Sequence, residues 1–310
     1  MFKLKNRLKR ILHTEPVVGL TIAGGGCRTL FSLGVGYVLQ QEGIKFHSMS
    51  ATSAGSAVAL NLASNMTMEA YKKFIDTISQ NKSNFYFKEL LRGKRPFPHE
   101  VMYREILKES MDVEVIKKSG IALAFNALKL PSDLYPHNKP LKRNQVLVKL
   151  IKALVKEYSN SNKGYYLPIV PTLVKKLGLV EEIFTVDKEH SLEDVVDIAL
   201  KTSSAPPLLS FQKTKNGEYY LDGSFLDNLP ITHHPKKVDL NIAIYYDAGS
   251  KELIKTMGRD RGQNLFYVYP DRPVPASMFD YTNAKQVQQT FEMGLEQGEN
   301  MLRFLKAFVT

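Results

Sequence analysis

Cysteine is almost absent from this chain. Cys27 is the single thiol among 310 residues, which excludes an intrachain disulfide and fits a reducing compartment. The sequence also lacks the Cys/His spacing of a zinc site and the loop spacing of a calcium site, so no metal and no other cofactor is expected. We expect Cys27 to be a small packing residue rather than a nucleophile.

Long apolar runs are missing as well, since no segment approaches the ~20 residues needed to cross a bilayer. The first residues have the charge of a signal-peptide start, but no apolar region follows them, so no secretory signal is expected. Within residues 1–12, four apolar side chains fit one helical face, with Lys and Arg largely off it. The basic N-terminal segment, 1–15, is interpreted either as a peripheral contact with an anionic membrane or as a solvated tail. The expected location is therefore the cytoplasm or the membrane periphery.

Acidic residues are outnumbered, with 31 Asp and Glu against 42 Lys and Arg, a formal net charge of +11. Such a charge favours anionic partners, which are nucleic acids or acidic lipid headgroups, although a solvated basic surface needs neither. The sequence contains no zinc-finger spacing, no basic-region heptads and no aromatic ribonucleoprotein motif, so no nucleic-acid partner is expected. The hydrophobic fraction of 44% is sufficient for a sizeable core.

Strand and helix patterns alternate at the start of the chain. Val17–Ala23 and Lys45–Thr52 have the composition of buried strands, and each leads through a turn of small residues into a helical pattern. This order predicts an α/β fold with a mostly parallel sheet. Residues 81–164 are rich in aromatic and basic residues and indicate a helical, basic insertion or cap. A helix is predicted over 283–309, and one domain over 16–310.

Ser53 occupies the turn between the second strand and its helix, in the run Ala51-Thr52-Ser53-Ala54-Gly55. This is the arrangement of a nucleophile elbow, in which a tight turn presents a serine hydroxyl above the sheet. Small residues are needed because strand and helix approach closely there. Gly55 meets that need, and Ala51 stands where glycine is usual. Taken alone, the motif also fits a helix-capping serine.

A glycine loop, Gly24-Gly25-Gly26-Cys27-Arg28, follows the first strand and precedes the first helix. Consecutive glycines let backbone N–H groups converge on one point, where an oxyanion or a phosphate can bind. The spacing fits neither a dinucleotide loop nor a phosphate-binding P-loop. An oxyanion hole near the elbow serine accounts for both motifs together.

A third motif, Asp222-Gly223-Ser224, ends a short apolar strand. The three motifs, in this order, resemble the patatin-like phospholipase family, and the resemblance extends over roughly residues 17–247. It implies a three-layer α/β/α patatin-like fold with a mostly parallel central sheet. It also implies a dyad of Ser53 as nucleophile and Asp222 as its base. Ala51 and Ser224 are the two departures from the family motifs.

The resemblance further implies the roles of the loop residues. Gly25 and Gly26 would supply the main oxyanion donors, within a loop that runs from Gly24 through Cys27 to Arg28. Arg28 would stabilise the loop or the phosphate side of a substrate. A Ser-Asp-His triad through His233 or His234 is the alternative to the dyad.

The expected activity is a lipid acyl hydrolase of phospholipase A type, acting on glycerophospholipids through an acyl-serine intermediate. The first alternative is hydrolysis of neutral glycerides, lysolipids or acyl thioesters, and the second is a catalytically weak lipid- or partner-binding module. The family resemblance is compatible with a cellular lipid-turnover enzyme and with a secreted bacterial effector. No protein partner or activator is indicated.

Overall fold

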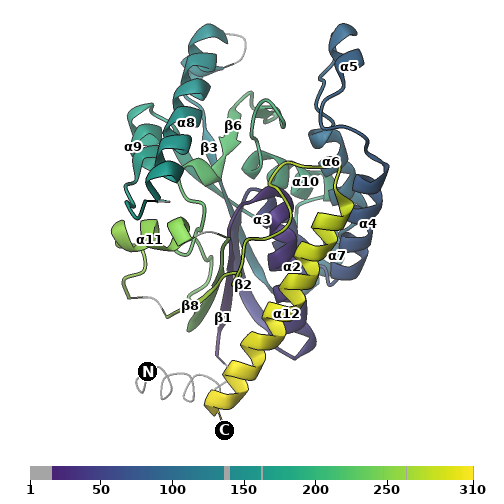
Figure 1. The fold of residues 1–310 in the computed structure, drawn as a ribbon, viewed down its shortest axis with the longest axis vertical. Helices are drawn as coiled ribbons and strands as arrows, with labels where there is room; N and C mark the ends of the chain where they lie inside the picture. Colours follow the sequence, from purple (N-terminus) through teal and green to yellow (C-terminus); the bar gives the residue numbers. More distant parts are fainter. Residues whose placement is uncertain (1–15, 136–139, 162, 247, 263, 310) are drawn as a thin grey trace.

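The computed structural model describes residues 16–135, 140–161, 163–246, 248–262 and 264–309. The predicted membrane contact of residues 1–12 lies outside the described residues. Within them the chain forms one eight-stranded sheet with helices on both faces (Figure 1). The predicted three-layer α/β/α class with a mostly parallel central sheet is confirmed. No helix in the described part of the chain is long and apolar enough to span a bilayer.

The strands are β1 (Val18–Ile22), β2 (Phe46–Thr52), β3 (Ala122–Lys129), β4 (Val180–Thr185), β5 (Gln212–Lys213), β6 (Tyr219–Asp222), β7 (Leu240–Ile244) and β8 (Leu265–Val268). The α-helices are α2 (Leu30–Gln41), α3 (Ala54–Ala63), α4 (Thr67–Gln80), α5 (Phe87–Leu91), α6 (His99–Glu109), α7 (Val113–Lys118), α8 (Pro140–Ser161), α9 (Ile169–Lys176), α10 (Leu192–Thr202), α11 (Ala248–Thr256) and α12 (Ala284–Val309). Three short 3-10 helices are η1 (Gly26–Thr29), η2 (Ser132–Leu134) and η3 (Gly223–Phe225).

The centre of the sheet is parallel, in the order β3-β2-β1-β7-β8. Parallel strands need crossover connections, and helices such as α2 and α3 supply them. Because all five strands run the same way, the turns that follow β1 and β2 lie at one end of the sheet. The glycine loop and the elbow serine are therefore neighbours.

β3 corrects one expectation about residues 81–164. The sequence analysis treated this region as an insertion or cap, yet β3 is a buried strand in the middle of the sheet. The strand contains only Ala, Leu, Phe, Asn and Lys, so it lacks the β-branched residues that usually mark strands. Its pairing with β2 overrides the weak local preference. The helices on either side of it are separate elements rather than one inserted unit.

The two sides of β3 decide where the site forms. Residues 127–129 pair with β4 and β6 at once, and residues 124–126 pair with β4 and β2 at once. Each strand has only two edges, so β6 and β2 must share the edge opposite β4. They meet there end to end, since Thr52 pairs with Asn126 and Asp222 pairs with Ala127. The last residue of β6 is thereby brought next to the turn that follows β2.

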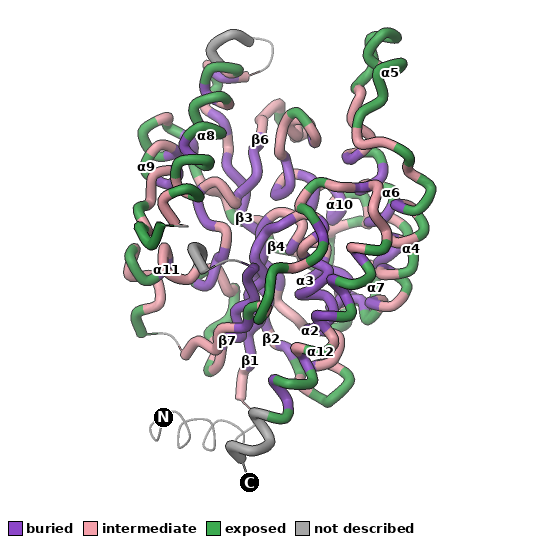
Figure 2. Tube along the Cα trace, viewed as in Figure 1, coloured by how far each residue is buried: buried purple, intermediate pink, exposed green. Residues whose placement is uncertain are grey.

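Both faces of the central strands β1, β2 and β3 are buried, as is usual for a parallel centre (Figure 2). Leu123 and Phe125 of β3 belong to the large core formed with α2, α3 and α12. Leu128 belongs to a second core, which α8 and α9 cover through residues such as Leu150 and Val174. The alternation along β3 follows the two-residue repeat of a strand. The turns that follow β1 and β2 are thus held by a layer that is packed on both faces.

Candidate active site

Ser53 lies at the apex of the β2–α3 turn in a strained backbone conformation. Its φ is 53° and its ψ is −138°, in a region that residues with a side chain rarely adopt and that costs about 1–3 kcal/mol. Hydrogen bonds on both sides hold it there. The Ser53 N–H donates to Thr202 Oγ1 over 3.0 Å, and the Ser53 carbonyl accepts from the Ser56 N–H at 2.9 Å and its hydroxyl at 2.6 Å. The turn is therefore fixed before any substrate binds.

Close packing under the turn explains its small residues. A Cβ at Gly55 would lie 2.8 Å from the carbonyl oxygens of both Ile22 and Ala23, so α3 can approach β1 only with glycine there. Ala51 is fully buried inside β2, where it pairs with Ile22 and with Phe125. The close approach is at Gly55, and the methyl group of Ala51 fits within the sheet.

Asp222 accepts a hydrogen bond from the hydroxyl of Ser53. The Ser53 Oγ donates to Asp222 Oδ2 over 2.6 Å, and the Ser224 N–H donates to Oδ1 over 2.8 Å. Asp222 is 4% exposed, and this burial raises the pKa of its carboxyl to about 6, against the lowering effect of these hydrogen bonds. A carboxylate with a raised pKa in direct contact with a serine hydroxyl can accept its proton.

The C-terminal end of α10 and the residues that follow it connect the two turns. Thr202 Oγ1 accepts the Ser53 N–H and donates to the Asn126 carbonyl over 2.6 Å. Two residues later, the Ser204 carbonyl accepts the Asp222 N–H over 2.9 Å. One short segment therefore positions the backbones of both serine and aspartate. The sequence analysis assigned this segment no role.

Asn126 is a second residue whose role sequence reasoning missed. It is fully buried in β3, and its amide donates to Glu181 Oε1 and to the carbonyls of Gly223 and Asp227, over 3.0 to 3.4 Å. It thus joins the turn after Asp222 to β4. The available signal was a lone polar residue within an apolar run, which indicates a buried hydrogen-bonding role.

The glycine loop lies directly beside Ser53. A Cβ at Gly24 would lie 2.8 Å from the Ser53 Cβ. The N–H groups of Gly24, Cys27 and Arg28 already donate to carbonyl oxygens, at 3.3, 3.0 and 3.2 Å. In the part of the chain that the structure describes, the N–H groups of Gly25 and Gly26 have no such partner. Gly25 and Gly26 are therefore the loop residues whose N–H groups are available as oxyanion donors.

The remaining loop residues hold its shape. Gly26 has φ +55°, and a Cβ there would lie 1.9 Å from the Met278 carbonyl oxygen. Arg28 turns back over the loop, donating to the Gly25 carbonyl at 3.4 Å and lying 5.7 Å from the Tyr246 ring centre. Cys27 is buried, and this burial raises the pKa of its thiol, as suits a packing residue.

Ala54 adds a donor that the sequence analysis did not assign. It is the first residue of α3, so its N–H lies in the first turn, where a helix has no internal acceptors. The residue after an elbow nucleophile commonly contributes its N–H to an oxyanion hole. The positive end of the α3 dipole adds to this potential.

The two candidate histidines of a triad have other partners. His234 is held between Ser48 and Thr21, with its ring nitrogens 3.0 Å from each hydroxyl, and burial lowers its pKa to about 4. His233 Nε2 lies 3.1 Å from Glu181 Oε1. Among the described residues, neither histidine is hydrogen-bonded to Ser53 or Asp222.

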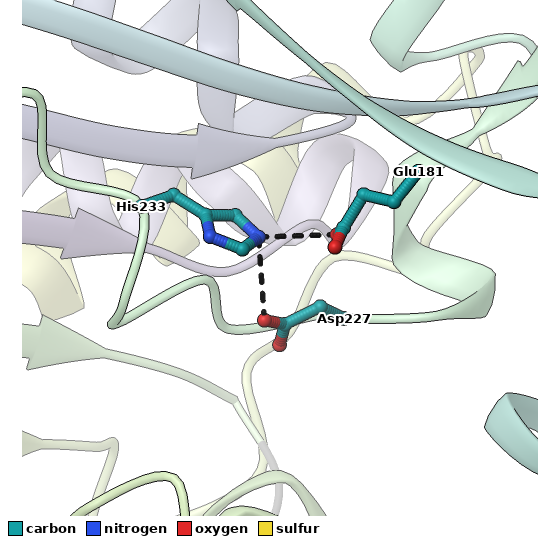
Figure 3. A group of neighbouring side chains, drawn as sticks. All are labelled: Glu181, Asp227 and His233. Atoms are coloured by element: carbon teal, nitrogen blue, oxygen red, sulfur yellow. Dashed lines mark hydrogen bonds and ion pairs between the residues drawn. The ribbon is translucent and has the colours of Figure 1, made fainter.

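A cluster of three titratable side chains lies near the turn that follows Asp222. It consists of Glu181, Asp227 and His233 (Figure 3). They are far apart in sequence, so no spacing motif marked them. These are metal-ligating residue types, but the Arg259 guanidinium forms an ion pair with Asp227, and the Asn126 amide donates to Glu181. Burial raises the pKa of Asp227 to about 6, and Arg259 opposes that rise. The cluster is therefore an ion-paired and hydrogen-bonded support for the turn that follows Asp222.

Comparison with known protein families identifies the family of this chain. Residues 20–233, which include Ser53, Asp222 and the glycine loop, match the patatin-like phospholipase family. The chain belongs to this family. At the family level, membership identifies it as a lipid acyl hydrolase. The predicted resemblance is thereby confirmed, and no curated protein matches the chain individually.

The chain also matches solved structures, among them a phospholipase A2 and a type III effector protein. The chain matches VipD from Legionella pneumophila with 14% identity and a TM-score of 0.44, covering 94% of this chain and 67% of VipD. It matches human GIVD cytosolic phospholipase A2 with 12% identity and a TM-score of 0.47, covering 99% and 63%. For the type III effector protein ExoU the identity is 13% and the TM-score 0.35, covering 94% and 53%. The chain spans about two thirds or less of the length of these proteins.

The two departures from the family motifs leave the site geometry intact. Ala51 is accommodated inside the sheet, as described above. Ser224 contributes its backbone N–H to Asp222, and any non-proline residue carries that donor. Neither departure interrupts the contact between serine and aspartate.

Proposed function

We propose that this protein is a phospholipase of the A type, which releases fatty acid from glycerophospholipids by means of a Ser53–Asp222 dyad. The observation that carries the proposal is the 2.6 Å hydrogen bond from Ser53 Oγ to a buried carboxylate. Family membership supports the substrate class.

In the proposed reaction, Ser53 Oγ attacks the ester carbonyl while its proton passes to Asp222. The N–H groups of Gly25, Gly26 and Ala54 stabilise the oxygen that becomes negative. Collapse of this intermediate expels the lysolipid alkoxide, which takes the proton from Asp222. Water, activated by the same carboxylate, then hydrolyses the acyl-serine and restores both residues.

The test is hydrolysis of mixed phospholipids by purified protein, with released fatty acid and lysolipid measured by mass spectrometry. Ser53→Ala and Asp222→Asn should each lower kcat/KM at least about 10⁴-fold, because each removes a group that acts in the chemical step. His233→Ala and His234→Ala should have mild effects, because neither ring is hydrogen-bonded to Ser53 or Asp222 among the described residues. A histidine variant as inactive as Ser53→Ala would contradict the dyad.

A further inference from the structure

The segment between α4 and α6 leaves the body of the protein as an arm, defined here as residues 82–97. Figure 1 shows α5 at its tip, beyond the end of the sheet at which the strands' carboxyl ends lie. None of the residues of α5 is buried, and Figure 2 shows the tip as exposed. Phe87 is 60% exposed and Leu91 73%, with Phe85 and Leu90 also exposed. Such grouped apolar side chains at a tip mark an interaction surface.

The charge of the arm is strongly positive. It carries five Lys or Arg side chains and a single acidic residue, Glu89. Glu89 pairs with Arg92, at 2.7 Å between Oε1 and Nη1. Exposed Lys82, Lys88 and Lys94 add to the positive field around the apolar tip. Apolar side chains among basic ones match a surface with anionic headgroups above an apolar interior.

The base of the arm is bonded to both sides of the active site. Asn84 Nδ2 donates to Asp280 Oδ1 at 2.9 Å, and nearby in that loop the Met278 carbonyl accepts the Cys27 N–H of the glycine loop. On the other side, Arg95 donates to the carbonyls of Pro207 and Leu208, at 2.7 and 2.9 Å. These two residues follow the segment that positions Ser53 and Asp222. The arm is thus anchored to the active-site loops and extends away from them.

We propose that this arm docks the protein on an anionic lipid bilayer, with Phe87 and Leu91 entering the headgroup boundary and Lys88 and Lys94 against lipid phosphates. The proposal rests on the phospholipase function above, because a water-insoluble substrate must be met at its surface. The positive charge of the arm favours a bilayer with acidic headgroups over a neutral one. Docking there turns the strand end that carries Ser53 toward the lipid.

The experiment measures binding separately from hydrolysis. Full-length Ser53→Ala protein is sedimented with vesicles of phosphatidylcholine, or of phosphatidylcholine with phosphatidylserine, at low and high salt. Binding should be tighter to the charged vesicles and should weaken as salt rises. Adding Phe87→Ser and Leu91→Ser should lower affinity at least about tenfold, since each removes buried apolar area in the bound state. Lys88→Gln with Lys94→Gln should reduce the preference for charged vesicles.

Helix α7 provides matched controls, because Val115 and Lys118 are exposed residues of the same kinds on a helix outside the arm. Val115→Ser and Lys118→Gln should bind vesicles as the parent does. Unchanged binding by the Phe87/Leu91 variant, or binding that ignores lipid charge, would overturn the proposal. So would a tip-dependent dimer in sedimentation velocity, which would assign the surface to a second copy of the chain.

The two proposals fail in distinguishable ways. In the protein that retains Ser53, the substitutions Phe87→Ser and Leu91→Ser should leave hydrolysis of a soluble short-chain ester unchanged, since neither residue contacts the dyad. Tip-dependent vesicle binding by a protein without lipid hydrolysis would sink the phospholipase assignment and leave docking standing. Lipid hydrolysis without tip-dependent binding would overturn the docking proposal and leave the phospholipase assignment standing.

Discussion

At the active-site centre, where β2 and β6 end, Ser53 and Asp222 lie beside glycines at which an added Cβ would lie within 3 Å of neighbouring atoms. At the tip of the arm, Phe87 and Leu91 lie largely in solvent. The centre buries the Asp222 carboxylate and gives each of its oxygens a hydrogen bond, whereas the arm leaves large apolar side chains exposed. Under the two proposals above, the chemistry depends on fixed geometry and the lipid contact depends on exposed surface.

The centre also bears a cost that the arm does not. Burial raises the pKa of Asp222 above its ordinary 3.8 to about 6, so the folded state holds a proton more tightly than the unfolded chain. Stability from this group is therefore present below the unfolded value and lost as pH rises through 6. At neutral pH the loss is about 3 kcal/mol, by the free energy of a pKa shift of this size. Strain and desolvation at active sites are typical of this exchange of stability for function.

The largest effect that would sharpen the comparison is expected in the glycine loop. Gly26→Ala should lower kcat/KM for a soluble ester about 10²–10³-fold, because the added methyl group displaces an oxyanion donor. Gly43→Ala is the control, since Gly43 also has a positive φ but has open space around it. Thermal unfolding shows whether each variant is folded.

A folded Gly26→Ala protein with activity within tenfold of the wild type would contradict the oxyanion assignment. Gly25→Ala serves if the first variant does not fold. A Cβ at Gly25 would meet the Tyr246 ring at 2.9 Å, which is a side chain and can shift.

A smaller effect is expected from pH. Because the carboxylate form of Asp222 accepts the proton, kcat/KM on a soluble ester should be constant above about pH 7 and fall tenfold per unit below 6. Asp227, whose pKa burial also raises to about 6, is the competing source. The profile of Asp227→Asn should keep the inflection. Its disappearance in that variant would transfer the inflection to the supporting cluster.

The smallest effect is expected at Thr202, which touches no substrate. Thr202→Val leaves the Ser53 N–H without its acceptor, and kcat should fall about tenfold with KM little changed, a loss of about 1.4 kcal/mol. Thr202→Ser retains the hydroxyl and should restore activity. Equal losses in both variants would mean that packing of the methyl group, rather than the hydrogen bond, positions the turn.

Local sequence was sufficient to predict the elements whose own residues mark them. The elbow around Ser53 and the glycine run at Gly24–Gly26 need tight turns between strand and helix, and small residues at fixed spacing announce such turns. Their order along the chain, together with the motif at Asp222, was sufficient for the family. The strand β3 was not predicted from the sequence, because its residues have little intrinsic preference for a strand.

Tertiary structure alone decided which groups meet. β2 and β6 end at adjacent residues of β3, and only that register sets Ser53 Oγ 2.6 Å from Asp222. The roles of Asn126 and Thr202, and the cluster around His233, depend on the same long-range pairing. The exposure of the arm likewise follows from what the rest of the chain leaves uncovered. Local turn chemistry is written in neighbouring residues, whereas contacts across 169 positions exist only once the sheet has formed.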